Sequence, residues 1–497
     1  MRRMTFLALA QLALPVAAAR PMLILNEDND HYFYQNRTNM SVQALEAYVD
    51  NFARGHVTHF FMCPSGQRPS YNSKVWEPIW AGCDPGDFRY PSGTTWAENC
   101  RYLHDQGIDP YEVWVRRCRE KGVSPWITTR MNDTHFADIP NYFRTTTFVR
   151  RRSDLWRKPD WKRGDAWSLK ALDYSKADAR RWMLDLVHEQ IGRWDADGIE
   201  LDWLRGPENL TPGKEREQAH FLTDMVRIVR GWTLAAAQRR GHPVRLGVRV
   251  PVDPDMARAY GLDVVVWAKE GLLDLIVPEG GSFVTPVRKW REQIGLAGEH
   301  VFICPGIDNC FESSPGVRDA MNVAVYRGWA DAQYLQGADG LYLFNLPYCP
   351  DSVTGTIFGE GLAPEHVRKS NRNYEVTHEE LGPVGWRKES FLPLHAACGG
   401  EILLPVGTPS ASGNVLVILG AREKYSDVIP KTMLNGMSAN EVVHPFFNDE
   451  TKVAFCFSAS ALSHDRNMLK VGSVPGSSAE WVRCELEVPA GPVRAAR

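Results

Sequence analysis

Eight short apolar runs recur between about residues 22 and 348 and alternate with longer amphipathic segments. They read PMLILNED, VTHFFMCPS, VSPWITTRMND, DGIELDWLR, VRLGVRVPV, LDLIVPEGG, VFICPGIDN and ADGLYLFNLP. Short β-rich runs that alternate with helical segments are typical of βα units in a parallel sheet. One intervening segment, residues 175–194, repeats its apolar residues at helical spacing. Eight such units predict an α/β fold of the (β/α)8 (TIM) barrel type.

The chain is longer than one barrel needs, and the additional residues fall into three parts. A barrel of this type takes about 250 residues, whereas the predicted barrel domain covers residues 20–383. Two insertions, residues 64–100 and 136–167, follow the second and third strands, and we expect both to lie over the mouth of the barrel. From about Val384 short strands alternate with turns, which predicts a β-sandwich-like accessory domain over residues 384–497.

The N-terminal stretch MRRMTFLALAQLALPVAAAR has two arginines, an apolar stretch and a cluster of small residues. This layout is typical of a secretory signal peptide, here residues 1–19, and predicts a secreted or periplasmic protein with no membrane contact after cleavage. An uncleaved signal anchor is the alternative. The 57 basic and 60 acidic residues form no long run of like charge, so nucleic acid is not an expected partner.

The cysteines and histidines indicate neither a metal site nor a bound cofactor. Ten cysteines in an exported chain permit disulfides, for example Cys63 with Cys83 or Cys304 with Cys310, although scattered free thiols are an equal alternative. No Cys or His cluster has the spacing of a zinc site.

Polar residues are concentrated where the predicted strands end. In a (β/α)8 barrel the carboxyl ends of the strands surround the active site, so these side chains should converge on one mouth. The candidates are Asp28, Arg130, Asn132, His135, Glu200, Asp202, Arg205, Arg249, Glu279, Asp308 and Asn345.

Glu200 and Asp202 stand two places apart in one strand and therefore point to the same face. A barrel interior tolerates buried carboxylates only near its mouth, where substrate, water or a basic partner such as Arg205 or Arg249 can compensate the charge. An ion pair that only stabilises the barrel is the alternative, especially for the deeper Glu200.

The combination of carboxylates, amides, guanidinium groups and aromatic rings at this mouth suits a sugar. Carboxylates and amides bind hydroxyl groups, aromatic faces stack on the apolar faces of sugars, and two acids can cleave a glycosidic bond. The aromatic candidates are Trp76, Trp80, Trp126, Trp203 and Tyr348.

The stretch ALDYSKADARRWMLDLVHEQIGRWDADGIELDWLRG resembles the fourth βα unit of the family 10-like glycosyl hydrolases, barrel proteins related to the α-galactosidase superfamily. In that family a DGIxLD strand follows a helix that opens with an LDxxxPxVR-like segment. The resemblance implies a glycoside hydrolase in which Asp202 is the nucleophile and Glu279 the proton donor. Ser175, Lys176 and Trp203 depart from the family pattern, and the resemblance does not indicate which substrate the chain acts on.

We therefore expect an exported glycoside hydrolase that acts on a poly- or oligosaccharide with two carboxylates. The catalytic candidates are Asp202, Glu279 and Glu200, with Asp308 as the rival acid, and the other strand-end residues are expected to bind substrate. Two alternatives stay open. One is a barrel that binds glycans without cleaving them. The other is a lyase for acidic polysaccharides, in which Arg130, Arg205 and Arg249 neutralise a uronate and His135 acts as the base.

Overall fold

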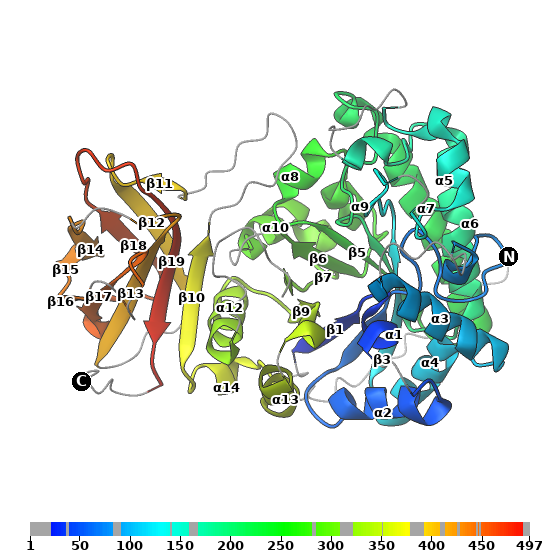
Figure 1. Cartoon of the computed structure of the whole chain (residues 1–497), viewed down its shortest axis with the longest axis horizontal. Helices are drawn as coiled ribbons and strands as arrows, with labels where there is room; N and C mark the ends of the chain where they lie inside the picture. Colours follow the sequence, from blue (N-terminus) through cyan, green and yellow to red (C-terminus); the bar gives the residue numbers. More distant parts are fainter. Residues whose placement is uncertain are drawn as a thin grey trace, which may run out of the picture.

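The structure is a computed structural model that describes residues 21–35, 39–82, 91–139, 142–158, 167–280, 285–308, 322–349, 351–377, 392–407, 413–424, 428–443, 446 and 449–490. The predicted signal peptide lies outside these residues, as do Cys83 and Cys310 of the suggested disulfides. A parallel sheet surrounded by helices forms one unit, and antiparallel strands form a second unit at the C-terminal end (Figure 1). Among the described helices, none combines the length and the apolar character needed to cross a membrane.

Each of the eight apolar runs supplies one strand position of a parallel sheet with the order β7-β6-β5-β4-β3-β2-β1-β9-β8. The strands are β1 (Met22–Glu27), β2 (His59–Met62), β3 (Ser124–Arg130), β4 (Gly198–Asp202), β5 (Arg245–Pro251), β6 (Leu275–Glu279), β7 (Phe302–Ile303), β8 (Gly306–Asp308) and β9 (Gly340–Phe344). The two ends of this order, β7 and β8, are consecutive in the chain and separated only by Cys304 and Pro305.

This broken seventh run closes the barrel. The amide of Cys304 donates to the carbonyl of Ile276 on β6 at 3.0 Å, and the amide of Tyr342 on β9 donates to the carbonyl of Pro305 at 3.0 Å. Proline has no N–H to donate, which explains the interruption between β7 and β8. Because the segment bonds to both edges of the sheet, the predicted (β/α)8 barrel is confirmed.

Helices surround the barrel and bury a large apolar cluster against the outer face of the strands. They are α1 (His31–Gln35), α2 (Val42–Ala53), α3 (Pro91–Asp105), α4 (Pro110–Lys121), α5 (Thr147–Arg151), α6 (Ala177–Arg193), α7 (Glu215–Arg240), α8 (Pro254–Ala259), α9 (Val264–Lys269), α10 (Val287–Ile294), α12 (Val323–Leu335), α13 (Asp351–Glu360) and α14 (Pro364–Val367). The helix predicted over 175–194 is α6, which buries Ala179, Met183, Leu186, Val187 and Ile191 as its spacing requires. A smaller apolar cluster fills the barrel interior.

The C-terminal unit is the expected all-β domain and has its own apolar core between two antiparallel sheets. Its strands are β10 (Arg372–Thr377), β11 (Leu394–His395), β12 (Gly400–Val406), β13 (Asn414–Ala421), β14 (Thr432–Leu434), β15 (Met437–Ser438), β16 (Glu441–Val443), β17 (Lys452–Ser458), β18 (Asp465–Val471) and β19 (Glu480–Val488). The expected boundary at 383/384 lies outside the described residues, and β10, which precedes it in the chain, pairs with β19 of this domain.

Candidate active site

The carboxyl ends of three neighbouring strands bring charged side chains to the same level of the barrel mouth. The register of the parallel sheet places Arg130 of β3 beside Asp202 of β4, and Asp202 beside Arg249 of β5. One strand further, Pro251 of β5 lies beside Glu279 of β6. Residues from four consecutive strands therefore converge here, as predicted for a barrel of this class.

Arg249 is the centre of this arrangement. Its Nη1 donates to Oδ2 of Asp202 at 3.0 Å, while Nε and Nη2 donate to the two carboxylate oxygens of Glu279 at 2.9 and 2.5 Å. The guanidinium also lies 3.9 Å from the ring centroid of Phe344. All three charged side chains are buried, so one cation compensates two buried carboxylates. Asp202 is further held by the amide of Leu204, which donates to its Oδ1 at 2.9 Å.

Glu200 lies one layer deeper on the same face of β4 and is completely buried. Its Oε2 accepts hydrogen bonds from the Thr128 hydroxyl at 2.5 Å and from the Tyr342 hydroxyl at 3.0 Å. The Tyr342 hydroxyl in turn accepts from Nδ2 of Asn26 at 2.6 Å. Burial and the charge of Asp202 raise the pKa of Glu200 to about 8, against the opposing effect of Thr128 and Arg249.

A second chain of charges runs from β1 across the mouth. Arg130 binds both oxygens of the Asp28 carboxylate and donates from Nη1 to Oδ2 of Asp133 at 2.6 Å. Asp133 also holds Nδ1 of His135 at 2.6 Å. Burial opposes ionisation of Asp133, but His135 and Arg130 together keep its pKa well below the usual range. Both ends of Arg130 are therefore occupied by carboxylates.

The rim of the mouth carries the polar side chains that reach solvent. The side chain of His135 is 33% exposed, that of Arg205 21% and that of Asp308 16%. Nη2 of Arg205 lies 3.2 Å from Nε2 of His135, and its Nη1 lies 4.0 Å from Oδ2 of Asp308. Nδ2 of Asn345 donates to Oδ1 of Asp308 at 2.7 Å. Four of the predicted substrate-binding residues thus form one connected rim.

Asn132 instead connects two loops of the scaffold. Its Nδ2 donates to the carbonyl of Leu172 at 3.0 Å and lies 3.2 Å from Oδ1 of Asn209, while its Oδ1 accepts from the amide of Leu172 at 3.0 Å. The described parts of the two insertions pack beside it. Nη2 of Arg68 donates to the carbonyl of Thr145 at 3.1 Å, and Gln67 donates to the carbonyl of His135.

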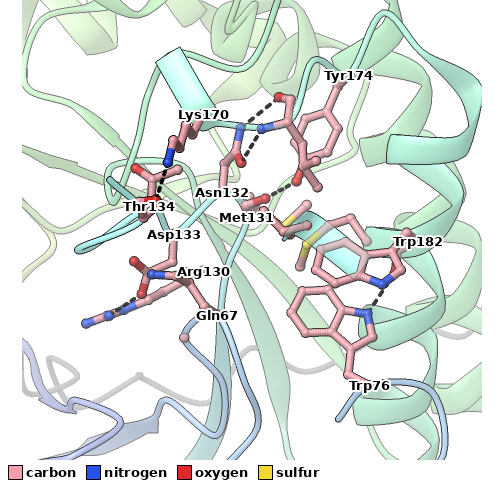
Figure 2. A pocket seen from close by; sticks show the side chains of 15 residues that line it. Gln67, Trp76, Arg130, Met131, Asn132, Asp133, Thr134, Lys170, Tyr174 and Trp182 are labelled. Atoms are coloured by element: carbon pink, nitrogen blue, oxygen red, sulfur yellow. Dashed lines mark hydrogen bonds and ion pairs between the residues drawn. The ribbon is translucent and has the colours of Figure 1, made fainter. Parts of the chain in front are cut away.

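A small cavity lies between these insertions and α6, next to Arg130 and Asp133 (Figure 2). One wall is formed by the rings of Trp76 and Trp182, which stack with centroids 3.6 Å apart. Nε1 of Trp76 also donates to the backbone carbonyl of Trp182 at 3.0 Å. Figure 2 shows Arg130 and Asp133 directed toward one another on the other side of this cavity.

The tryptophans expected to stack on a sugar serve mainly as packing residues. Trp126 stacks on Phe61 inside the barrel at 4.7 Å, Trp203 is fully buried, and Trp76 is covered by Trp182. Trp80 stacks on His104 at 5.2 Å. Two interior rings, Phe344 and Tyr342, lie 3.9 and 6.0 Å from the guanidinium of Arg249, and Phe344 also lies 5.1 Å from that of Arg205.

Asp28, Asp30 and His31 place possible metal-ligand atoms within 4.8 Å of one another. The chemistry of this group does not suit a cation, because Asp28 is already bound by Arg130. Burial disfavours the charged form of His31, but Glu27 with Asp28 and Asp30 raises its pKa to about 9.

Three residues of the site escaped the sequence prediction: Thr128, Tyr342 and Phe344. Their positions follow from alternation, because Thr128 stands two residues before Arg130, and Tyr342 and Phe344 stand two apart on β9. The alternation of side chains along each strand indicates that these residues point into the barrel. No sequence pattern indicates which interior hydroxyl or ring contacts which charged group.

No family model and no curated protein matches the sequence. Among solved structures, the chain is similar to a cycloisomaltooligosaccharide glucanotransferase from Paenibacillus sp., with 9% identity and a TM-score of 0.34 over 95% of this chain and 57% of that protein. It is also similar to a maltogenic α-amylase from Thermotoga neapolitana, with 12% identity and a TM-score of 0.39 over 91% of this chain and 99% of that protein.

A GH36 α-galactosidase from Geobacillus stearothermophilus shares 12% identity at a TM-score of 0.37, over 95% of this chain and 55% of that protein. The chain thus spans little more than half of the glucanotransferase and of the α-galactosidase. At such identities only folds are compared, and we take the function of this chain from its own residues.

Proposed function

We propose that the chain is a glycoside hydrolase in which Asp202 is the nucleophile. The observation that supports this most strongly is the buried Asp202–Arg249–Glu279 arrangement at the carboxyl end of β4, β5 and β6. Barrel enzymes place their catalytic groups at this end of the strands. A carboxylate there that is oriented by a guanidinium and a backbone amide is suited to attack an anomeric carbon.

Asp202 has the contacts that a nucleophile of this kind needs. Arg249 bonds its Oδ2 and the Leu204 amide bonds its Oδ1, so the carboxylate is fixed in one orientation while lone pairs remain for the substrate. Attack on the anomeric carbon displaces the leaving-group oxygen and forms a covalent glycosyl ester. The proton donor protonates that oxygen as it leaves. The same group, now ionised, takes a proton from the water that hydrolyses the ester, which regenerates Asp202 and the donor and releases the sugar with retained configuration.

We assign the proton donor to Asp308. The resemblance to the family 10-like glycosyl hydrolases favours Glu279, and burial raises the pKa of Glu279, although Arg249 opposes this shift. Both oxygens of Glu279 are nevertheless bound by Arg249, whereas the side chain of Asp308 is 16% exposed at the rim. Asp308 lies on the rim, where it can reach a glycosidic oxygen, whereas Glu279 orients Arg249.

The rim residues Arg205, His135 and Asn345 are proposed to bind sugar hydroxyl groups. The side chains of His135 and Arg205 are 33% and 21% exposed, so both can meet a substrate at the mouth. The lyase alternative needs guanidinium groups that can neutralise a uronate, but Arg130 and Arg249 already bind two carboxylates each. We therefore expect an uncharged sugar at this mouth, with Arg130 and Asn132 supporting the loops.

The first test is hydrolysis of a panel of 2,4-dinitrophenyl and 4-nitrophenyl glycosides by the purified protein. We expect turnover of at least one sugar, and a loss of at least about 1,000-fold in kcat/KM for Asp202→Asn, because no nucleophile remains. Asp105→Asn, at an exposed helix end, is the matched control and should retain full activity. Full activity of Asp202→Asn, or binding without turnover, would refute the proposal.

The second test separates the two candidate acids. A dinitrophenolate leaves without protonation, so loss of the proton donor should spare kcat/KM for this substrate and lower kcat/KM only for glycosides with poor leaving groups. Asp308→Asn is expected to show that difference. Glu279→Gln should reduce the rate on both kinds of substrate, because it releases Arg249. The opposite pattern would reassign the acid to Glu279, and an unsaturated product would establish a lyase.

We also propose that the protein is exported to the periplasm or the medium, which suits an enzyme for poly- or oligosaccharides. Mass spectrometry of the protein isolated from its native host should find a mature N-terminus close to residue 20. An intact N-terminus would contradict this.

A further inference from the structure

Beneath Asp202 lies a group of polar side chains that the proposed mechanism does not use. It consists of Asn26, Thr128, Glu200 and Tyr342, from four different strands, and we call it the interior network. Hydrogen bonds run from Asn26 to Tyr342 and from Tyr342 and Thr128 to Oε2 of Glu200. All four side chains are buried. Its single carboxyl group therefore has to be accommodated without solvent.

Among the described residues, no cation forms a hydrogen bond or an ion pair with Glu200. The charged and titratable groups that face it are Asp202 on β4, Arg249 on β5 and Tyr342 on β9. The adjacent position on β5 is Gly247, which brings no side chain to this level. Arg249 is the cation that lowers the pKa of Glu200, but its guanidinium already binds Asp202 at 3.0 Å and Glu279 at 2.9 and 2.5 Å. An ionised Glu200 would be the third carboxylate beside one guanidinium.

The hydrogen bonds of Glu200 indicate its protonation state. Oε2 accepts two bonds, whereas among the described residues no partner is found for the equally buried Oε1. A buried carboxylate normally has both oxygens bonded, because an unsatisfied charged oxygen is costly. A neutral carboxylic acid carries no charge, so a buried oxygen without a partner costs less in the acid than in the carboxylate.

We propose that Glu200 is a neutral carboxylic acid in the working enzyme. In this form it adds no negative charge beside Arg249, so Arg249 stays bonded to Asp202 and keeps the nucleophile in position. This inference rests on the proposed function of Asp202. Ionisation of Glu200 would attract Arg249 away from Asp202 and toward the barrel interior. The nucleophile would then lose the bond that orients it, and the rate of glycosyl transfer to Asp202 would fall. Burial and Asp202 raise the pKa of Glu200 to about 8, which places this loss above neutral pH.

The test is the pH dependence of kcat/KM on a dinitrophenyl glycoside. This substrate needs no proton donor, so the ionisation of Asp308 does not contribute to the profile. Wild-type activity should be level around pH 7 and decline above pH 8. Glu200→Gln, which keeps the shape and neutrality of the acid, should lie within about threefold of wild type at pH 7 and should lack the decline. Glu217→Gln, an exposed carboxyl on α7, is the matched control and should retain the wild-type profile.

Tyr342→Phe tests whether a hydrogen bond of the interior network controls the ionisation of Glu200. The hydrogen bond that Tyr342 donates favours the ionised form of Glu200, so its loss should move the alkaline decline to higher pH. A decline that persists in Glu200→Gln, or a folded Glu200→Gln variant that is inactive at every pH, would overturn the proposal.

A measurement without substrate separates this inference from the proposed function. The pKa of Glu200 is higher in the folded state than its ordinary value of 4.5, so wild-type stability should fall as the pH rises from about 5 to 8. Glu200→Gln lacks this dependence. The melting temperature of the variant minus that of wild type should therefore increase as the pH rises over the same range. A constant difference between the two proteins would mean that Glu200 is ionised, even if no glycoside is ever cleaved.

Discussion

At the scale of single residues, Arg249 determines the electrostatics of the candidate active site. It bonds Asp202 and Glu279, lies against Phe344, and is almost completely excluded from solvent. Burial of two carboxylates beside one guanidinium is tolerated because five N–H donors in one plane satisfy several oxygens at once. Lysine would bring a charge but not this geometry.

Arg249→Met is expected to lower the free energy of unfolding by about 3–5 kcal/mol, because removal of one partner leaves buried carboxylates without a counter-charge. Activity should fall with it, since Asp202 loses its orienting bond. Urea unfolding followed by circular dichroism measures the first effect. The combined change Arg249→Met with Glu279→Gln should recover part of the stability but not the activity.

Arg227→Met is the control for a surface arginine. Arg227 also bonds two carboxylates, Asp224 and Glu270, but its side chain is 46% exposed. The expected cost is below about 1 kcal/mol, because solvent screens exposed ion pairs. An equal cost for both arginine variants would show that burial is not what makes Arg249 important.

At the scale of secondary-structure elements, the short strand β8 supports the ion pair from below. A Cβ atom at Gly306 would lie 2.3 Å from Oε2 of Glu279. The two groups therefore approach as closely as they do only because position 306 has no side chain. The break at Pro305 sets this strand off from β7, so its position depends on the pairing with β9.

Gly306→Ala is expected to displace Glu279 from Arg249, to cost about 1–3 kcal/mol in unfolding free energy, and to reduce kcat/KM. Gly231→Ala is the matched control, because Gly231 is exposed in the middle of α7 with no atom within 4 Å of an added Cβ. That change should stabilise the protein by about 0.5–1 kcal/mol through helix propensity. Thermal unfolding of both variants tests whether Gly306→Ala lowers and Gly231→Ala raises the stability, and steady-state kinetics test whether only Gly306→Ala lowers kcat/KM.

At the scale of the whole molecule, the barrel and the β domain meet where α12 packs against β10 (Figure 1). Asp331 of α12 is buried in this junction. It accepts hydrogen bonds from Nη1 of Arg372 at 3.0 Å and from the Tyr374 hydroxyl at 2.6 Å, both on β10. A buried charge pair of this kind ties the position of one domain to that of the other.

Asp331→Asn is expected to cost about 3–5 kcal/mol, because the buried Arg372 would lose the negative charge of Asp331. Activity of the folded protein should persist, since none of these residues belongs to the barrel mouth. Glu360→Ala, which removes an exposed partner of Arg327, should cost about 1 kcal/mol or less. Calorimetry should detect a large decrease in melting temperature for Asp331→Asn only. An unchanged melting temperature of Asp331→Asn would argue against a coupled junction.

The architecture of the barrel could be predicted from the sequence because it follows from local patterns. Eight apolar runs of strand length and the helical spacing of 175–194 depend only on neighbouring residues, and they became β1 to β9 and α6. The topology of parallel sheets then places every strand end at one mouth. This is why the polar residues predicted from strand ends, including Asp202, Arg249 and Glu279, do meet in space.

The pairing among those residues was decided by the tertiary structure alone. The sequence placed Glu200 and Asp202 on one face of β4. Sheet register and side-chain length decide that Arg249 binds both Asp202 and Glu279. They also decide that Arg130 binds Asp28. The same holds for Trp76, Trp126 and Trp203, which the sequence suggested as stacking platforms for a sugar and which are buried in the structure. The strand period determines which way a side chain points, whereas its partner is set by contacts between distant segments that no local pattern encodes.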